Sequence, residues 1–256
     1  MLPVGVNTRF TAFWICLFGL KVPPGTRIAM TQGNSTAENQ NIAVRQMLSD
    51  PTPQWAWIIG DDHTFQPDII YKLLDRELDF VSPLCAMRHP PYGPSVFKHG
   101  EGGIGAPITW DEIPQYALTE VDGTGLAGAL VRRTVFEKIS DPWFEVGQLP
   151  GESVRSGEDI YFCKKARQAG VKIWLDPTLQ VGHMTTIVLD PIQTASGWGI
   201  GLDLGSMVRL TVKFDDSAQN IHISDRGPQR PPSDPYLHGA QGLDQASLKR
   251  LLEGVV

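Results

Sequence analysis

One stretch constrains the fold of this chain more than any other, residues 55–68 with the sequence WAWIIGDDHTFQPD. Its apolar part, AWII, runs without alternation into Gly60, which is typical of a strand buried on both faces that ends at a backbone-permissive residue. Asp61-Asp62-His63 follows, and Pro67 then opens a segment with apolar residues at helical spacing. The order strand, acidic loop, helix is typical of an open α/β sheet, which binds its ligands beyond the carboxyl ends of the strands.

Apolar runs and helix-like segments alternate along the first two thirds of the chain. Pro and Gly separate them, as in Pro23-Pro24-Gly25 and Pro51-Thr52-Pro53. The alternation predicts a mostly parallel, Rossmann-like central sheet flanked by helices. The expected strands cover residues 2–6, 26–30, 56–59, 80–84, 130–131 and 171–175, and the expected helices cover residues 10–20, 37–48, 69–78, 132–139 and 157–170.

The remaining segments are expected to form loops and a C-terminal extension. Residues 88–128 are rich in Pro and Gly, so we expect long loops there and a hairpin over one face, and such loops usually carry function. Beyond His183 we expect strands over residues 208–214 and 220–224, a Pro-rich linker over 227–235 and a short helix over 244–253. This tail could be a lid, a homodimer contact or both.

The charge balance limits what the chain can bind. Of its 256 residues, 22 are Lys or Arg and 28 are Asp or Glu, which gives a net charge of −6 without a basic run. A nucleic-acid backbone is therefore not an expected partner, and an acidic protein that handles phosphates needs a metal ion. Three widely spaced cysteines, Cys16, Cys85 and Cys163, favour reduced structural thiols in a cytosolic protein and do not suggest a zinc site.

No segment is predicted to span a membrane. The longest apolar N-terminal stretch, residues 10–20, is shorter than the ~20 residues that cross a bilayer. It also lacks the positively charged start and the small-residue cleavage site of a secretion signal. We therefore expect a cytoplasmic protein without a membrane span.

The loop Asp61-Asp62-His63 is the first candidate site. It offers two carboxylates and one imidazole, a set that suits Mn²⁺ or Mg²⁺ bridging phosphate oxygens. The alternative is a solvated turn whose aspartates cap the following helix.

A second candidate site lies about a hundred residues later. Glu158 and Asp159 fall in the first turn of a predicted helix, where the helix dipole stabilises their charged forms. One of them could be a general base for an acceptor hydroxyl, or both could be ordinary N-terminal acids. His183, after the next predicted strand, could be a metal ligand or an ordinary loop histidine.

Four features stand in a fixed order along the chain: the strand that ends in Asp61-Asp62-His63, the glycine-rich GTGLAG of residues 123–128, the motif Gly157-Glu158-Asp159, and the pair Asp176-Pro177 followed by Gly182-His183. With these motifs the chain resembles the GT-A glycosyltransferases, in particular the family 2-like enzymes, over roughly residues 2–183. The resemblance implies a GT-A-like catalytic domain over residues 1–200, with a donor-binding half (1–87) and an acceptor half (88–200), followed by an extension over 201–256.

The resemblance also implies a function. It implies a metal-dependent glycosyltransferase that moves a sugar from a nucleoside-diphosphate sugar to a hydroxyl of a saccharide or another acceptor. In the family, the first motif is the D-x-D site for metal and diphosphate, the second lines the acceptor pocket, and the third supplies the catalytic carboxylate. Asp159 is then the base of an inverting reaction, and Glu158 contacts the acceptor or the donor sugar.

The metal site follows from the same resemblance. Asp61 and His63 become the outer positions of a D-x-H variant, and His183 completes the site for Mn²⁺ or Mg²⁺. Asp62 then contacts the donor or shares the metal. Arg88, with His89, could add positive charge beside the diphosphate, or the two could be an exposed surface pair.

The nucleotide is expected to be UDP, with GDP open. Relatives often carry an aspartate that reads uracil at the end of the second strand, where this chain has Thr31-Gln32-Gly33-Asn34. An amide such as that of Gln32 can still pair with a base edge. Further donor contacts are expected from Thr8 and Arg9, from Asn41, which falls where relatives carry Arg-Asn, and from Gly125 and Gly128.

Three other functions stay open. A nucleotidyltransferase would need a G-x-G-T-R segment after the first strand, which residues 6–10 do not supply. A metal-dependent hydrolase could use the same acids and histidines to activate water. A non-catalytic nucleotide-sugar-binding module is less compatible with the intact acids Asp61, Asp62 and Asp159. P-loop, H-E-x-x-H and Rossmann fingerprints are absent from the sequence.

Overall fold

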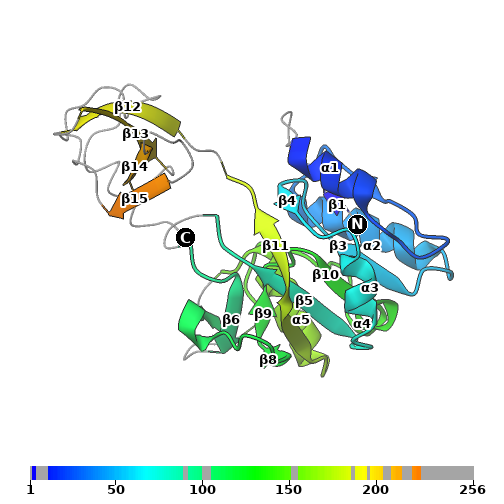
Figure 1. Cartoon of the computed structure of the whole chain (residues 1–256). Coiled ribbons are helices and arrows are strands. Elements are labelled where there is room, and N and C mark those ends of the chain that lie inside the picture. The colour runs from blue at the N-terminus through cyan, green and yellow to red at the C-terminus, as the bar shows by residue number, and fades with distance from the viewer. Residues whose placement is uncertain are drawn as a thin grey trace. The chain divides into compact units, whose positions relative to one another are not determined.

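The computed structural model describes residues 2–3, 11–88, 92–99, 105–150, 155–185, 188–194, 197–203, 209–214 and 221–225. The chain divides into two compact units, Met1–Thr186 and Ile187–Val256. Figure 1 labels their elements. The boundary expected at residue 200 falls inside the second unit, within strand β13 (Gly197–Asp203).

The first unit is built on a mixed sheet. Its strand order is β3 (Trp55–Ile58), β10 (Ala129–Arg132), β5 (Phe80–Cys85), β11 (Ile173–His183) and β4 (His63–Thr64), and β8 (Thr119–Val121) also pairs with β11. β5 and β11 are parallel, whereas β10 is antiparallel to both β3 and β5, so β3, β5 and β11 share one direction. A short parallel pair joins β1 (Leu2–Pro3) to β2 (Met30–Thr31).

The reversed strand β10 brings a loop to the carboxyl end of β3. Ala129 pairs with Ile58, and the N–H of Gly128 donates to the Ile58 carbonyl at 2.8 Å. Gly128 has φ +79°, and a Cβ there would meet side-chain atoms of Pro83 and Val181 at 3.1 Å, so the tight turn requires glycine. The alternation of sequence patterns did not predict this reversal, because pattern alone carries no strand direction.

Helices cover both faces of the sheet. The first core cluster packs one face against α2 (Thr36–Ser49), α4 (Arg133–Lys138) and α5 (Glu158–Gln168), and the second packs the other face against α1 (Thr11–Gly19) and α3 (Ile69–Leu74). The five helices expected between residues 10 and 170 are therefore confirmed, with ends that differ by a few residues.

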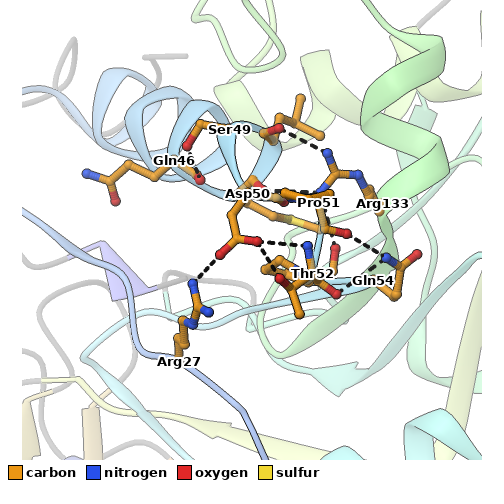
Figure 2. A network of polar contacts seen from close by, with 11 residues as sticks. Arg27, Gln46, Ser49, Asp50, Pro51, Thr52, Gln54 and Arg133 are labelled. Atoms are coloured by element: carbon orange, nitrogen blue, oxygen red, sulfur yellow. Dashed lines mark hydrogen bonds and ion pairs between the residues drawn. The ribbon is translucent and has the colours of Figure 1, made fainter.

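The ends of α2 are set by side chains. Ser35 caps the helix by accepting from the N–H of Glu38 at 3.3 Å. At the other end, the guanidinium of Arg133, the first residue of α4, donates to the carbonyls of Asp50 at 2.6 Å and Leu48 at 3.0 Å. Figure 2 shows this network, in which the Asp50 carboxylate also binds Arg27 and the turn at Thr52. The network holds the turn that leads into β3.

The chain between β5 and β10 forms a small antiparallel sheet. Its order is β7 (Gly105–Pro107), β6 (Val96–His99) and β9 (Gly123–Thr124), with a 3₁₀ turn η1 (Trp110–Glu112) between β7 and β8. The hairpin expected within residues 88–128 is thus present as β6–β7.

Strand β11 is longer than the expected strand 171–175. Its pairing with β5 shifts register between Asp176 and Gln180, where β11 contains extra residues. β11 then resumes its pairing and runs past the end of β5. Asp176 is fully buried, accepts from the N–H of Thr178 at 3.0 Å and pairs with Arg76 at 2.7 Å, and these contacts hold the irregular segment. The bulge lets β11 continue to His183.

The second unit contains an antiparallel sheet of β12 (Val188–Thr194), β13, β14 (Arg209–Phe214) and β15 (Ile221–Asp225). β14 and β15 match the strands expected over residues 208–214 and 220–224, whereas β12 and β13 were not expected. The linker and the helix expected over residues 227–235 and 244–253 lie outside the described residues. Within the described part of the chain, no helix has both the length and the apolar character that a bilayer crossing requires.

Candidate active site

A cavity of about 1130 Å³ lies at the carboxyl ends of β3, β5 and β11 in the first unit. Four segments far apart in the sequence line it. They are the loop before α2 with its first turns, the loop after β3, the turn before β10, and the start of α5. Arg88 and His183 also line the cavity. Among the residues expected at the site, the lining includes Gln32, Asp61, Asp62, His63, Gly125, Glu158, Asp159 and His183.

The loop after β3 places one histidine against another. His63 opens β4 and pairs with His183 at the end of β11, and the two imidazoles stack with ring centroids 4.4 Å apart. His63 is buried, and a Cβ on Gly60 would lie 3.0 Å from its Nδ1. The tight approach at Gly60 and the β4–β11 pairing together fix both rings.

Asp62 connects the two histidines. Its Oδ1 lies 2.9 Å from Nδ1 of His63, and its Oδ2 lies 3.3 Å from Nε2 of His183. Arg88 adds a third contact, with its guanidinium 2.7 Å from Oδ2. Burial acts to raise the pKa of Asp62, but the hydrogen bonds from the two imidazoles outweigh it and lower that pKa, so the carboxylate is charged at neutral pH.

The second nitrogen of His183 is held by the backbone. Nδ1 lies 3.0 Å from the carbonyl of Ala86, and because a carbonyl only accepts, this nitrogen carries the proton. Burial acts to lower the pKa of His183, yet its hydrogen bonds to Asp62, Cys85 and Ala86 raise that pKa to about 10. A ring that donates one nitrogen to a backbone carbonyl and directs the other at a charged partner has the usual environment of a metal-binding histidine.

Cys85 belongs to the same cluster, although the sequence analysis predicted only a structural thiol at this position. It is a free, buried cysteine at the end of β5, and its Sγ lies within 4.8 Å of ligand nitrogens of His63 and His183. Burial raises the pKa of this thiol, but hydrogen bonds to the imidazoles outweigh that effect and lower it. The available signal was its position, because Cys85 ends a buried strand that runs in the same direction as the strand before Asp61.

Glu158 and Asp159 open α5 and also line the cavity. The N–H of Ile160 donates to Oδ1 of Asp159 at 2.7 Å, and a Cβ on Gly125 would lie 3.5 Å from Oδ2. Burial, with a smaller contribution from the charge of Glu158, raises the pKa of Asp159 to about 6. A carboxylate with this pKa is ionised at neutral pH and is a stronger base than an ordinary aspartate.

The start of α2 contributes amides to the cavity. Asn39 and Gln40 line it and are buried, and in the described part of the chain Asn39 Oδ1 and Gln40 Oε1 have no hydrogen-bond partner. Buried polar atoms are normally paired, so these two acceptors favour a ligand with N–H or O–H donors. Asn39 Nδ2 donates to the Asn34 carbonyl at 3.2 Å, which fixes its Oδ1 as the acceptor.

Two expected donor contacts, Asn41 and Gly128, are not among the described residues that line the cavity. Asn41 is buried and bonds through both amide atoms to the backbone of Phe144, at 2.8 and 3.0 Å, and it is not among the described residues that line the cavity. Gly128 also lies outside this lining and serves the turn before β10. Thr8, Arg9 and His89 fall outside the described residues.

The residues present fit a divalent cation. Two imidazoles from paired strands, one with its far nitrogen bonded to a carbonyl, lie beside the Asp62 carboxylate and the Cys85 thiol. Asp61, the outer acid of the expected D-x-H motif, lines the cavity next to them.

No family model and no curated protein matches this chain. Among solved structures, the crystal structure of A197 from STIV matches with a TM-score of 0.50 and 17% sequence identity, over 72% of this chain and 84% of that one. The crystal structure of GalNAc-T7 with UDP, GalNAc and Mn²⁺ matches with a TM-score of 0.40 and 14% identity, over 57% of this chain and 30% of that one. At such identities the likeness concerns the fold. The sheet order and the packing of helices on both faces confirm the expected fold class, an α/β central sheet flanked by helices, and A197 shares this fold over 72% of the chain.

Proposed function

We propose that this protein is a metal-dependent glycosyltransferase that moves a sugar from a nucleoside-diphosphate sugar to an acceptor hydroxyl. One observation carries the proposal. The acidic loop after β3, His183, and the Glu158-Asp159 pair, which are far apart in the sequence, line a single cavity of about 1130 Å³. A cavity of this size, with charged groups on two sides, can hold a nucleotide sugar and part of an acceptor.

The base and ribose would bind at the start of α2. The side-chain carbonyl oxygens of Asn39 and Gln40, which have no partner among the described residues, would accept N–H or O–H groups of the nucleoside, and Gln32 also lines the cavity. Uracil and guanine both carry ring N–H donors, which is compatible with the expected preference for UDP and with GDP.

The diphosphate would bind near the histidine cluster. His63 and His183, with Asp61, would hold a divalent cation, expected as Mn²⁺ or Mg²⁺. When bound, this ion would neutralise the charge that develops on the leaving diphosphate. Arg88 would add a second positive charge. Asp62 contacts Arg88 and both imidazoles, and it would orient the donor sugar.

Asp159 would act as the base. The acceptor oxygen forms a bond to the anomeric carbon while its proton passes to the Asp159 carboxylate, and the bond from the anomeric carbon to the diphosphate oxygen breaks with its electrons. A single displacement of this kind inverts the anomeric configuration. Holding acceptor and donor in line on opposite sides of one cavity supplies the orientation that the step requires.

A donor screen tests the proposal. Purified full-length protein is incubated with a panel of nucleotide sugars, divalent cations and alcohol acceptors, and released nucleoside diphosphate is measured. We expect release from one nucleotide class, dependent on the cation and stimulated by an acceptor.

Three outcomes would favour the alternatives. Release that no acceptor stimulates, with free sugar as the product, would indicate a metal-dependent hydrolase. Formation of a nucleotide sugar from a nucleoside triphosphate and a sugar phosphate would indicate a nucleotidyltransferase. Binding of a nucleotide sugar without turnover would indicate a non-catalytic nucleotide-sugar-binding module.

A further inference from the structure

The proposed function does not use Cys85, although this residue lies within the histidine cluster. Its side chain is 4% exposed, and its Sγ and the ligand nitrogens of His63 and His183 all lie within 4.8 Å of one another. In the described part of the chain, His63, Cys85 and His183 form the group of metal-binding side chains whose ligand atoms lie close enough together to hold one ion.

The three side chains come from three neighbouring strands. Cys85 ends β5, His183 ends β11, and His63 begins β4, in the sheet order β5-β11-β4. Cys85 pairs with Val181, two residues before His183, and His183 pairs with His63. Since side chains two residues apart on a strand lie on the same face, the backbone pairing itself positions Cys85 beside both rings.

The chemistry of this set differs from that of a carboxylate site. Mn²⁺ and Mg²⁺ prefer oxygen ligands, whereas a thiolate with two imidazoles is typical of Zn²⁺ and other thiophilic cations. Three protein ligands also leave a fourth position open for water or a substrate oxygen.

We propose that His63, Cys85 and His183 form a cysteine–dihistidine metal site that selects Zn²⁺ or Co²⁺ over Mn²⁺ and Mg²⁺. This inference rests on the proposed function, because the site is the one assigned there to the cation, and it changes both the ligand set and the metal. Asp62 contacts both imidazoles and is not one of the three proposed ligands.

Cobalt binding tests the ligand assignment without any reaction. Full-length protein stripped with a chelator is titrated with Co²⁺ and its absorption is recorded. Wild-type protein should bind one ion and show a thiolate-to-cobalt charge-transfer band. A cobalt spectrum without that band in folded wild-type protein would overturn the assignment, whatever any variant does.

Two variants make the test specific. Cys85→Ser should remove the band and weaken Zn²⁺ binding at least about tenfold, the lower end of the loss that follows removal of even a metal site's outer partners. Cys16→Ser is the matched control, since Cys16 is a free thiol on α1 outside the cluster, and it should keep both band and affinity. Circular dichroism of the metal-free proteins reports whether each variant is folded.

Competition tests the selectivity. Zn²⁺ should displace bound Co²⁺, whereas a large excess of Mn²⁺ or Mg²⁺ should not, and displacement by Mn²⁺ at similar concentrations would overturn the proposal. These readouts need no nucleotide, so failure of the metal site and failure of the glycosyltransferase proposal are distinguishable. A Zn²⁺ site in a protein that transfers no sugar would contradict only the proposed function.

Discussion

Asp159 combines two properties of a catalytic base, since it lines the cavity and its pKa is raised to about 6 by burial and the charge of Glu158. We expect Asp159→Asn to lower the transfer rate by about 10²–10⁴-fold, the usual contribution of a positioned base, with donor binding retained. Initial rates and calorimetric donor binding on the two proteins measure this difference. A variant with an unchanged rate would remove Asp159 from the role.

The pH dependence gives an independent check on the same residue. A base must be deprotonated to act, so the wild-type rate should fall as the pH decreases through about 6. Glu158→Gln removes a neighbouring negative charge that raises the pKa of Asp159, so in this variant the fall should move to lower pH. The profile of kcat/KM measures both effects, and an identical profile in the two proteins would contradict the assignment.

The proposed metal ligands can be tested one at a time. We expect His183→Ala to abolish metal-dependent turnover of the donor and to weaken cation binding, with folding intact, because both proposed ligand sets include His183. Asp61→Ala should also abolish turnover, but it should weaken cation binding only if Asp61, and not Cys85, completes the site. Isothermal titration with the cation and circular dichroism report the two quantities. Unchanged metal affinity in either variant would remove that residue from the site.

At this scale the sequence predicted some residues and could not predict others. Asp62, His63, Asp159 and His183 follow recognisable motifs, and all line the cavity. Cys85 belongs to no motif. It lies near the histidines because of the β5–β11 register and the bulge between Asp176 and Gln180, and neither can be predicted from the sequence pattern. The amides of Asn39 and Gln40 were likewise not identified, because which face of α2 meets the cavity depends on packing.

At the scale of elements, helix and strand periodicity identified the main helices and the buried strands, but not strand direction. The reversal of β10 could not be predicted, although it places Gly125 at the carboxyl end of β3. β12 and β13 were missed because β12 contains a proline and β13 contains three glycines, and both residue types are uncommon inside strands.

The contacts of Arg133 with the end of α2 are expected to contribute to the stability of the fold. Its guanidinium donates to four carbonyls at the end of α2 and in the turn that follows, and its side chain is 13% exposed (Figure 2). Arg133→Ala would leave these carbonyls without that partner, and we expect a loss of about 1.5–3 kcal/mol in unfolding free energy, as for hydrogen bonds to a charged group. Chemical denaturation measures it.

Lys138→Ala is the control for Arg133, because Lys138 is an exposed residue of the same helix. It should change the unfolding free energy by no more than about 0.5 kcal/mol. Equal effects in the two variants would show that the network at the end of α2 contributes no specific stability.

At the scale of the whole molecule, the chain has two compact units, and every described residue that lines the cavity belongs to the first, Met1–Thr186. The resemblance implied an extension over residues 201–256, whereas the second compact unit begins at Ile187. We expect a chain that ends at Thr186 to retain nucleotide binding with an affinity close to that of the full chain. Calorimetry on both chains measures this, and a folded but non-binding short chain would show that the second unit is needed.

The most direct test of the account is the anomeric configuration of the product. With the donor and acceptor found by the screen, the full-length protein is allowed to react and the new glycosidic bond is examined by proton NMR. We predict a glycoside with the configuration opposite to that of the donor sugar, as a single displacement assisted by Asp159 requires. A glycoside with retained configuration would contradict the role of Asp159, and free sugar without any glycoside would contradict glycosyl transfer itself.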